Sequence, residues 1–235
     1  MIETTQGIVL HTIPYSESSV ISHMYTLTYG PLSFINSNVR VHRAKTAYFR
    51  PLSIVTIQFY LQKNNALHRI KHIEYSYIPK TIYDSVYKAN IALFVGEFLH
   101  SLCIHNESNP ELYKYIYSYI TFLDSENISF HQSHLIFLTH LLKYWGIIPQ
   151  NNHRADMYFI PQKGIFEKTF SEGALSLKIS NYLNEILQSN SFSNVIEISK
   201  TEKIELLEAI IQYFQFHTHS TKTLKTLDIL KSIFS

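Results

Sequence analysis

Short apolar runs separated by turn residues fill the first 80 positions of the chain. Five of these runs are rich in β-branched and aromatic side chains, which predicts β-strands. They cover residues 7–13, 20–28, 32–39, 51–62 and 66–78. Gly30 and Pro31 predict a turn between the second and third strands. The last run does not alternate cleanly between apolar and polar positions.

Five strands in about 80 residues suit a small closed β-barrel. The five-stranded OB-fold is the commonest barrel of that size. An SH3-like barrel would give much the same pattern, so the alternation alone does not separate the two folds.

Helical periodicity replaces this pattern after Pro79. Residues 81–104 carry apolar side chains near one helix face. Asn109 followed by Pro110 predicts the start of the next helix, because asparagine caps and proline suits the first turn. A further helix over 133–146 is expected to end at Gly146.

Three more helices are expected near residues 171–189, 201–217 and 222–234. Ser199 and Glu202 have the spacing of a capping box. Residues 148–170 contain two prolines and paired asparagines and predict an irregular insert. The pattern therefore predicts an α+β multidomain chain, with a barrel over 1–80 and a helical domain over 81–235.

Composition adds that the chain can bury a sizeable core, since 46% of its 235 residues are hydrophobic. Its one cysteine, Cys103, falls in an apolar run and is expected to be a buried small side chain. A single cysteine is consistent with a reducing cytoplasm. We expect neither a signal peptide nor a transmembrane helix, because no charged leader and no long uninterrupted apolar stretch is present.

Charge is unevenly distributed, which the net value of +2 conceals. Residues 1–80 hold eight Lys and Arg against three Asp and Glu, a net charge of +5. No acidic residue occurs between Glu17 and Glu74. A stretch of one sign makes a positive field, whose natural partner is a polyanion such as nucleic acid.

Catalytic motifs are missing from the sequence. It contains no GxSxG, Walker A, GxGxxG or HExxH motif. Its 13 histidines show no ligand spacing, and one cysteine cannot build a structural zinc site. We therefore expect no enzyme activity, no metal and no cofactor.

The order of these features resembles the RecO family of bacterial recombination proteins. The first strand is followed by Tyr15-Ser16-Glu17, the third by a basic loop over 40–45, and the fourth is entered through 48–52. Downstream, residues 109–124, 134–150 and 224–227 resemble the family's helices in the expected order. The resemblance covers nearly the whole chain, although no single motif is specific.

This resemblance implies an N-terminal OB-fold and a C-terminal all-α helical domain. It also implies binding to single- and double-stranded DNA, annealing of complementary strands and displacement of single-strand binding protein (SSB). With the partner RecR, such proteins help to load RecA on SSB-coated DNA. A cytoplasmic, nucleoid-associated protein is expected.

One departure from the family pattern concerns zinc. Many members carry a four-cysteine zinc finger in the insert, whereas residues 150–170 here contain no cysteine. We therefore predict that the zinc finger is absent and that apolar packing holds the insert. The packing residues would be Tyr158, Phe159, Ile160, Ile165 and Phe166.

Candidate DNA contacts are the cations of the barrel, because guanidinium and ammonium groups suit phosphate oxygens. They are Arg40, Arg43, Lys45, Arg50, Lys63, Arg69 and Lys71. Tyr48 and Phe34 are open candidates for base stacking, whereas Phe49 is expected in the core. The groove for the SSB C-terminal tail is predicted near Lys143 and Tyr144, with Leu141 and Leu142 nearby.

Two other function classes compete with this hypothesis. A protein-interaction scaffold whose barrel does not bind DNA would show no salt-dependent DNA binding. A nuclease would need a cluster of carboxylates or histidines, and nothing in the sequence selects one.

Overall fold

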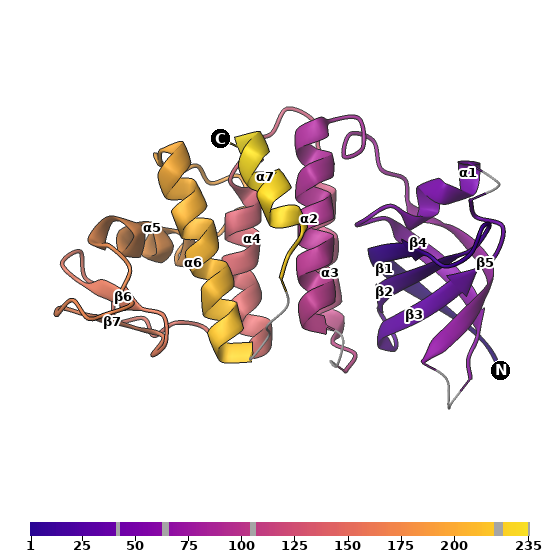
Figure 1. Ribbon diagram of the computed structural model, residues 1–235, viewed down its shortest axis with the longest axis horizontal. Coiled ribbons are helices and arrows are strands. Elements are labelled where there is room, and N and C mark those ends of the chain that lie inside the picture. The colour runs from indigo at the N-terminus through magenta and orange to yellow at the C-terminus, as the bar shows by residue number, and fades with distance from the viewer. Residues whose placement is uncertain (41–42, 63–65, 104–106, 219–222, 235) are drawn as a thin grey trace. The chain divides into compact units, whose positions relative to one another are not determined.

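The computed structural model describes residues 1–40, 43–62, 66–103, 107–218 and 223–234 (Figure 1). Contacts divide the chain into two compact units. Unit 1 comprises Met1–Glu126 with Leu224–Leu227, and unit 2 comprises Asn127–Thr223 with Asp228–Ser235. The helices up to Glu126 thus group with the barrel, and the predicted domain boundary at residue 80 stays a prediction.

Unit 1 contains a closed five-stranded barrel with the order β1-β2-β3-β5-β4. The strands are β1 (Ile2–Pro14), β2 (Val20–Thr26), β3 (Gly30–Asn36), β4 (Ile54–Tyr60) and β5 (Leu67–Tyr77). All neighbours are antiparallel except β3 and β5, which are parallel. The predicted five-stranded OB-fold barrel is confirmed.

Alternating side chains fill the barrel interior, as the period of two requires. Val9, Met24, Phe34, Val55 and Phe59 are among its buried residues. The irregular alternation in β5 has a structural cause, because the register with β4 shifts between Gln58 and Phe59. This bulge turns two successive side chains of β5 to the outside.

The remaining elements of unit 1 are helical. They are α1 (Arg43–Thr46), the 3₁₀ turn η1 (Ala47–Phe49), α2 (Val86–Cys103) and α3 (Pro110–Leu123). The predicted cap of α3 is confirmed, since the Asn109 side chain accepts the amides of Glu111 and Leu112 at 3.1 Å. Cys103 is buried, as predicted.

Unit 2 is mainly helical. Its elements are α4 (Ser133–Leu141), η2 (Leu142–Trp145), β6 (Tyr158–Ile160), β7 (Ile165–Glu167), α5 (Leu177–Leu187) and α6 (Lys200–Thr218), and α7 (Thr226–Phe234) begins in unit 1. Gly146 ends η2 with φ 67°, the left-handed cap that was predicted.

The predicted irregular insert holds a two-stranded antiparallel hairpin, β6 with β7, which the sequence pattern does not predict. Apolar side chains pack across it. The rings of Phe159 and Phe166 lie 5.0 Å apart, and Ile160 is buried beside them. Tyr158 and Ile165 are half-buried. The residues predicted to pack in the insert therefore lie in this hairpin, which contains no cysteine.

Candidate nucleic-acid interface

Arg40 follows β3 and is held against the loop between β1 and β2. Its backbone amide donates to the Ser18 carbonyl at 3.1 Å, and its guanidinium Nη1 donates to the Ser16 carbonyl at 2.9 Å. The neighbouring Val39 is buried and anchors the segment. Arg40 itself is exposed. An exposed, oriented cation therefore lies where two barrel loops meet.

The short helix α1 continues this basic segment. Lys45 is exposed on it. Arg43 is the first residue of α1, and its side chain lies outside the described part of the structure. Phe49 at the end of η1 is buried, as predicted, and fixes the segment to the barrel core.

Arg50 lies over an aromatic ring. Its Cζ is 4.9 Å from the ring centroid of Tyr83, a distance at which a cation is attracted to the ring face. The Tyr83 hydroxyl donates to the Pro51 carbonyl at 2.9 Å and lies 2.9 Å from Ser53 Oγ. Burial raises the pKa of Tyr83 to about 12, so the ring stays neutral at physiological pH. The contact with Tyr83 therefore orients the guanidinium of the exposed Arg50.

A shallow pocket of about 170 Å³ adjoins this arginine. Its lining residues include two cations, Arg50 and Lys80, together with the rings of Tyr75 and Tyr83. Asp84 also lines the pocket and offsets part of the positive charge. Cations beside aromatic rings are a combination that nucleic-acid surfaces use.

Arg69 and Lys71 project from the outer side of β5. Arg69 is exposed and pairs with Ile35 of β3 and Tyr60 of β4. Lys71 is exposed at the bulge. His72 is exposed next to it and lies 3.7 Å from the Glu74 carboxylate. Two predicted cations are thus presented to solvent by one strand.

The two candidates for base stacking, Phe34 and Tyr48, differ in their exposure. Phe34 is fully buried and contacts Phe59 edge-on at 5.1 Å, so it is a core residue and cannot stack on bases. Tyr48 is half-buried, with its ring 4.6 Å from that of Tyr75. Lys63, also predicted as a DNA contact, lies outside the described residues.

Lys143 and Tyr144 lie on η2 of unit 2. The Lys143 ammonium is 4.8 Å from the Tyr144 ring centroid, and Lys143 is exposed. Leu141 and Leu142 are fully buried in the helical core, so they do not form an exposed apolar floor. The SSB-tail groove at this position stays a prediction.

Sequence reasoning missed one group of side chains. His11, His23 and His100 form a cluster in unit 1 with ring centroids 4.4–6.3 Å apart. Their separation along the chain carries no recognisable spacing. The 13 histidines show no ligand spacing along the chain, so the sequence does not predict this group.

Neither a metal-binding cluster nor a membrane-spanning helix is found among the described residues. No group of three or more His, Cys, Asp or Glu side chains in the described ranges could hold a metal ion. Among the helices that the structure describes, none is long and apolar enough to cross a membrane.

Known proteins similar to this chain belong to one family, and the similarity covers nearly all of its length. Residues 1–78 match the family described as Recombination protein O N terminal, and residues 85–227 match Recombination protein O C terminal. A protein of Phocaeicola vulgatus named DNA repair protein RecO is 30% identical over 241 residues, covering 100% of both chains. A protein of the same name from Flavobacterium johnsoniae is 30% identical over 98% of both chains. Another, from Bacteroides fragilis, is 36% identical over 68% of this chain and 67% of the relative.

Proposed function

Because the chain belongs to the Recombination protein O (RecO) family, we propose that it mediates DNA repair and recombination by binding single- and double-stranded DNA. The protein promotes annealing of complementary strands and involves no covalent catalysis. It acts in the cytoplasm, at the nucleoid, where its substrate is.

The observation that carries this proposal is the exposure of the barrel's cations. Five predicted DNA contacts are exposed side chains of unit 1: Arg40, Lys45, Arg50, Arg69 and Lys71. No acidic residue occurs in the sequence between Glu17 and Glu74, and Asp84 offsets part of the charge near Arg50. Lys and Arg that neutralise phosphates release condensed counterions, which favours binding without regard to sequence.

Annealing follows from the same electrostatics. Two DNA strands repel each other through their phosphates. A positive surface that binds both strands lowers this repulsion and raises the local concentration of each strand near the other. The barrel thereby accelerates pairing while the bases themselves supply the specificity.

Partner binding belongs, in this proposal, to residues 81–235. They recruit RecR and the SSB C-terminal tail and thereby help to load RecA on SSB-coated DNA, with residues 1–80 holding the DNA. The exposed Lys143 beside Tyr144 supports a contact for an acidic tail with an aromatic end. Because Leu141 and Leu142 are buried, the proposal does not assign the apolar part of that groove to them.

The experiment is fluorescence anisotropy of a labelled single-stranded oligonucleotide over a salt series. The proposal expects tight binding at low salt and a log–log slope that corresponds to several released counterions. The triple variant Arg40→Ala, Arg43→Ala, Lys45→Ala should bind at least about tenfold more weakly, with a slope smaller by about three.

A matched control removes three exposed cations outside the barrel: Lys114→Ala, Lys163→Ala, Lys168→Ala. This variant has the same net charge as the first, and its affinity should stay within about twofold of the parent. Equal losses in both variants would mean that only net charge matters. Absence of binding even at low salt would favour the scaffold function instead.

A further inference from the structure

Three imidazole rings from three separate elements gather on unit 1. His11 comes from β1, His23 from β2 and His100 from α2. The centroids of His23 and His100 are 4.4 Å apart with planes at 28°, and those of His11 and His100 are 5.2 Å apart at 14°. His11 and His23 are 6.3 Å apart. We call these residues the histidine cluster.

Register and helix packing explain how the cluster forms. His11 and His23 are direct partners in the pairing of β1 with β2, so they share the outer face of the barrel. Gly96 brings α2 close to that face, because a Cβ at this position would be 2.5 Å from the Leu10 carbonyl oxygen. His100 is four residues later on the same helix face, directly above the two rings.

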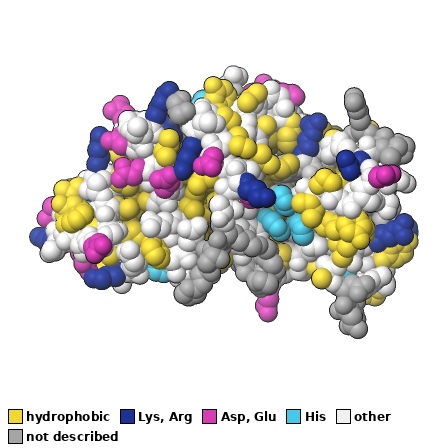
Figure 2. All heavy atoms as spheres, viewed as in Figure 1, with side chains coloured by type: hydrophobic (Ala, Val, Ile, Leu, Met, Phe, Trp, Pro, Cys, Tyr) yellow, Lys and Arg dark blue, Asp and Glu magenta, His cyan; other side chains and the backbone are white. Residues whose placement is uncertain are grey.

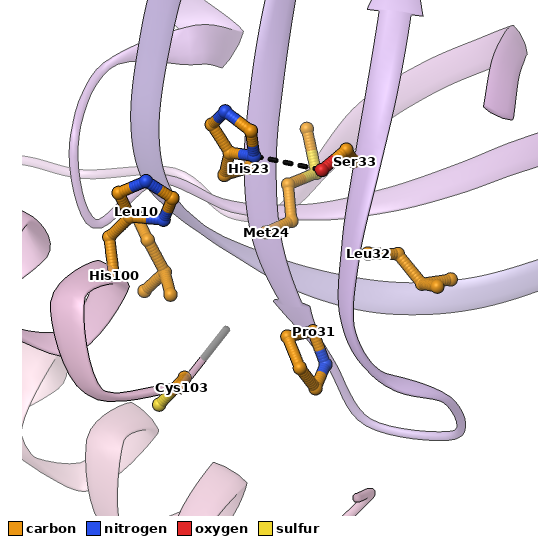
Figure 3. Close-up of a pocket in the computed structure, with 8 residues that line it drawn as sticks. All are labelled: Leu10, His23, Met24, Pro31, Leu32, Ser33, His100 and Cys103. Carbon is orange, nitrogen blue, oxygen red and sulfur yellow. Dashed lines mark hydrogen bonds between the residues drawn. The ribbon is translucent and has the colours of Figure 1, made fainter. Parts of the chain in front are cut away.

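The cluster borders a pocket of about 230 Å³. Figure 3 shows the rings of His23 and His100 side by side at its edge, with Pro31 and Leu32 of β3 across from them. His23 Nδ1 lies 2.8 Å from Ser33 Oγ, which orients the ring. All three histidines are half-buried. Figure 2 shows histidine side chains together at the surface, next to apolar side chains.

Several elements pack around the cluster, and their described polar and titratable groups are as follows. β1 contributes His11, β2 contributes His23, and β3 contributes the neutral Ser33. From α2 come Glu97 and Cys103, in addition to His100, and Lys225 is exposed on the segment that Glu97 contacts. The thiol of Cys103 is buried and uncharged, because burial raises its pKa to about 12.

The carboxylate of Glu97 lies near His11 and is already engaged in hydrogen bonds. It accepts the backbone amides of Lys225 at 3.1 Å and Thr226 at 2.9 Å, and the Thr226 hydroxyl at 2.6 Å. Burial acts to raise the pKa of Glu97, but these hydrogen bonds and the charge of His11 lower it overall. Glu97 therefore stays anionic near neutral pH.

A second and third proton on the cluster would repel the first at these separations. An anion placed at the pocket edge removes that repulsion. Binding of the anion and uptake of protons are then coupled, so each favours the other.

We propose that the histidine cluster is a proton-dependent contact for the phosphodiester backbone of single-stranded DNA, adjoining the pocket lined by His23 and His100. This inference rests on the proposed DNA-binding function. It adds that affinity for DNA rises as the pH falls through the range in which imidazole titrates. Acidic conditions would strengthen the hold of the barrel on a strand.

The test measures single-stranded DNA binding by the full chain at constant ionic strength, from about pH 8 to about pH 6. Uptake of one proton raises the affinity by up to about tenfold per pH unit. The variant His11→Gln, His23→Gln, His100→Gln should bind within about twofold of the parent at pH 8 and lose this gain. A matched control in unit 2, His131→Gln, His153→Gln, His217→Gln, should keep it.

Calorimetry of the unmodified protein is a second measurement that needs no substitution. In buffers of different ionisation enthalpy, binding near pH 6.5 should be accompanied by net proton uptake. Absence of uptake, or a gain that survives in the cluster variant, would overturn the inference. Binding at pH 8 with no gain on acidification leaves the proposed function standing, whereas no binding at any pH overturns both.

Discussion

Asp124 at the end of α3 binds the segment that leaves the barrel. Its carboxylate accepts the hydroxyl of Tyr77 at 2.8 Å and the amides of Lys80, Thr81 and Ile82 at 2.8–3.0 Å. The Thr81 hydroxyl donates to the Asp124 carbonyl. Only 1% of Asp124 is exposed, so these contacts supply what water would otherwise provide.

Replacement of Asp124 by Asn should destabilise unit 1 by about 2–3 kcal/mol, because hydrogen bonds to a buried charge are lost and an NH2 group meets backbone donors. Urea unfolding followed by circular dichroism measures this change. The control Asp156→Asn, at an exposed carboxylate that lies 3.6 Å from Lys168, should change stability by no more than about 0.5 kcal/mol.

The stability of this contact should also depend on pH. Burial acts to raise the pKa of Asp124, but the amides of Thr81, Lys80 and Ile82 and the Tyr77 hydroxyl lower it overall. A lowered folded-state pKa gives stability that is present above the unfolded value of about 3.9 and is lost as pH falls through the folded value. Between pH 7 and pH 3, the free energy of unfolding should fall more for the parent than for Asp124→Asn. Equal losses would contradict the assignment.

At the scale of elements, the approach of α2 to β1 depends on a single glycine. Gly96 is buried, and a Cβ there would also lie 3.3 Å from Pro51. The atom at 2.5 Å is a backbone oxygen, which cannot move aside as a flexible side chain would. The whole helix has to shift if this position gains a side chain.

Gly96→Ala should therefore destabilise the protein by about 1–3 kcal/mol, although alanine favours a helix over glycine by about 1 kcal/mol. Thermal unfolding by circular dichroism gives the size of the effect. Ser101→Ala on the same helix is the control and should be close to neutral. A stabilised Gly96→Ala protein would mean that α2 is not in close contact with β1.

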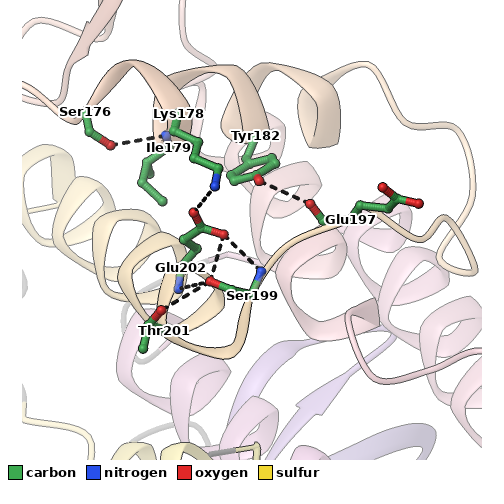
Figure 4. Close-up of polar contacts among 8 residues, drawn as sticks. All are labelled: Ser176, Lys178, Ile179, Tyr182, Glu197, Ser199, Thr201 and Glu202. Carbon is green, nitrogen blue, oxygen red and sulfur yellow. Dashed lines mark hydrogen bonds and ion pairs between the residues drawn. The ribbon is translucent and has the colours of Figure 1, made fainter.

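The start of α6 is held by a capping box that also joins α5 (Figure 4). The Glu202 amide donates to Ser199 Oγ at 3.3 Å, and the Ser199 amide donates to the Glu202 carboxylate at 2.9 Å. Lys178 of α5 forms an ion pair with the same carboxylate. Lys178 first, and then Ser199, lower the pKa of Glu202 to about 2.

Ser199→Ala should lower the free energy of unfolding by about 1 kcal/mol, the usual value of an N-cap. Denaturant unfolding followed by Trp145 fluorescence reports on this unit, because Trp145 is the chain's one tryptophan and lies edge-on to Phe214 of α6. Ser118→Ala, an exposed serine within α3, serves as the control. No change in the Ser199→Ala midpoint would show that the box contributes little.

Local signals explain why so much of this fold was predictable. Asn109, Gly146 and the Ser199–Glu202 pair act on their own neighbours, so their identity suffices. Phe34 could not be assigned, since strand alternation does not say which face is inside. The histidine cluster depends on how α2 packs on β1 and β2, which no spacing records. A turn glycine, Gly164, was the available signal for the unforeseen hairpin.

For the whole molecule, the proposed DNA contacts and the proposed partner contact lie in different parts of the chain. The cations proposed to bind DNA belong to unit 1, whereas Lys143 and Tyr144 belong to unit 2. A ligand that binds one folded unit stabilises that unit by mass action, by about 2.7 kcal/mol at one hundred times the dissociation constant.

Hydrogen exchange read by mass spectrometry should therefore show a local effect of single-stranded DNA. Amides of β1 to β5 should gain protection, and amides of α4 to α6 should change little. An oligonucleotide at high salt, where phosphate contacts are weak, is the control. Equal protection of both units would contradict the assignment of the DNA surface to the barrel.

The buried thiol of Cys103 has a practical consequence. It is 1% exposed at the end of α2, and its raised pKa leaves almost no reactive thiolate in the folded state. Since the chain has no other cysteine, an excess of an alkylating reagent can modify it only during excursions that lift this end of the helix from the barrel. The alkylation rate of Cys103 therefore reports how often this end of the helix opens, and no cysteine has to be introduced as a probe.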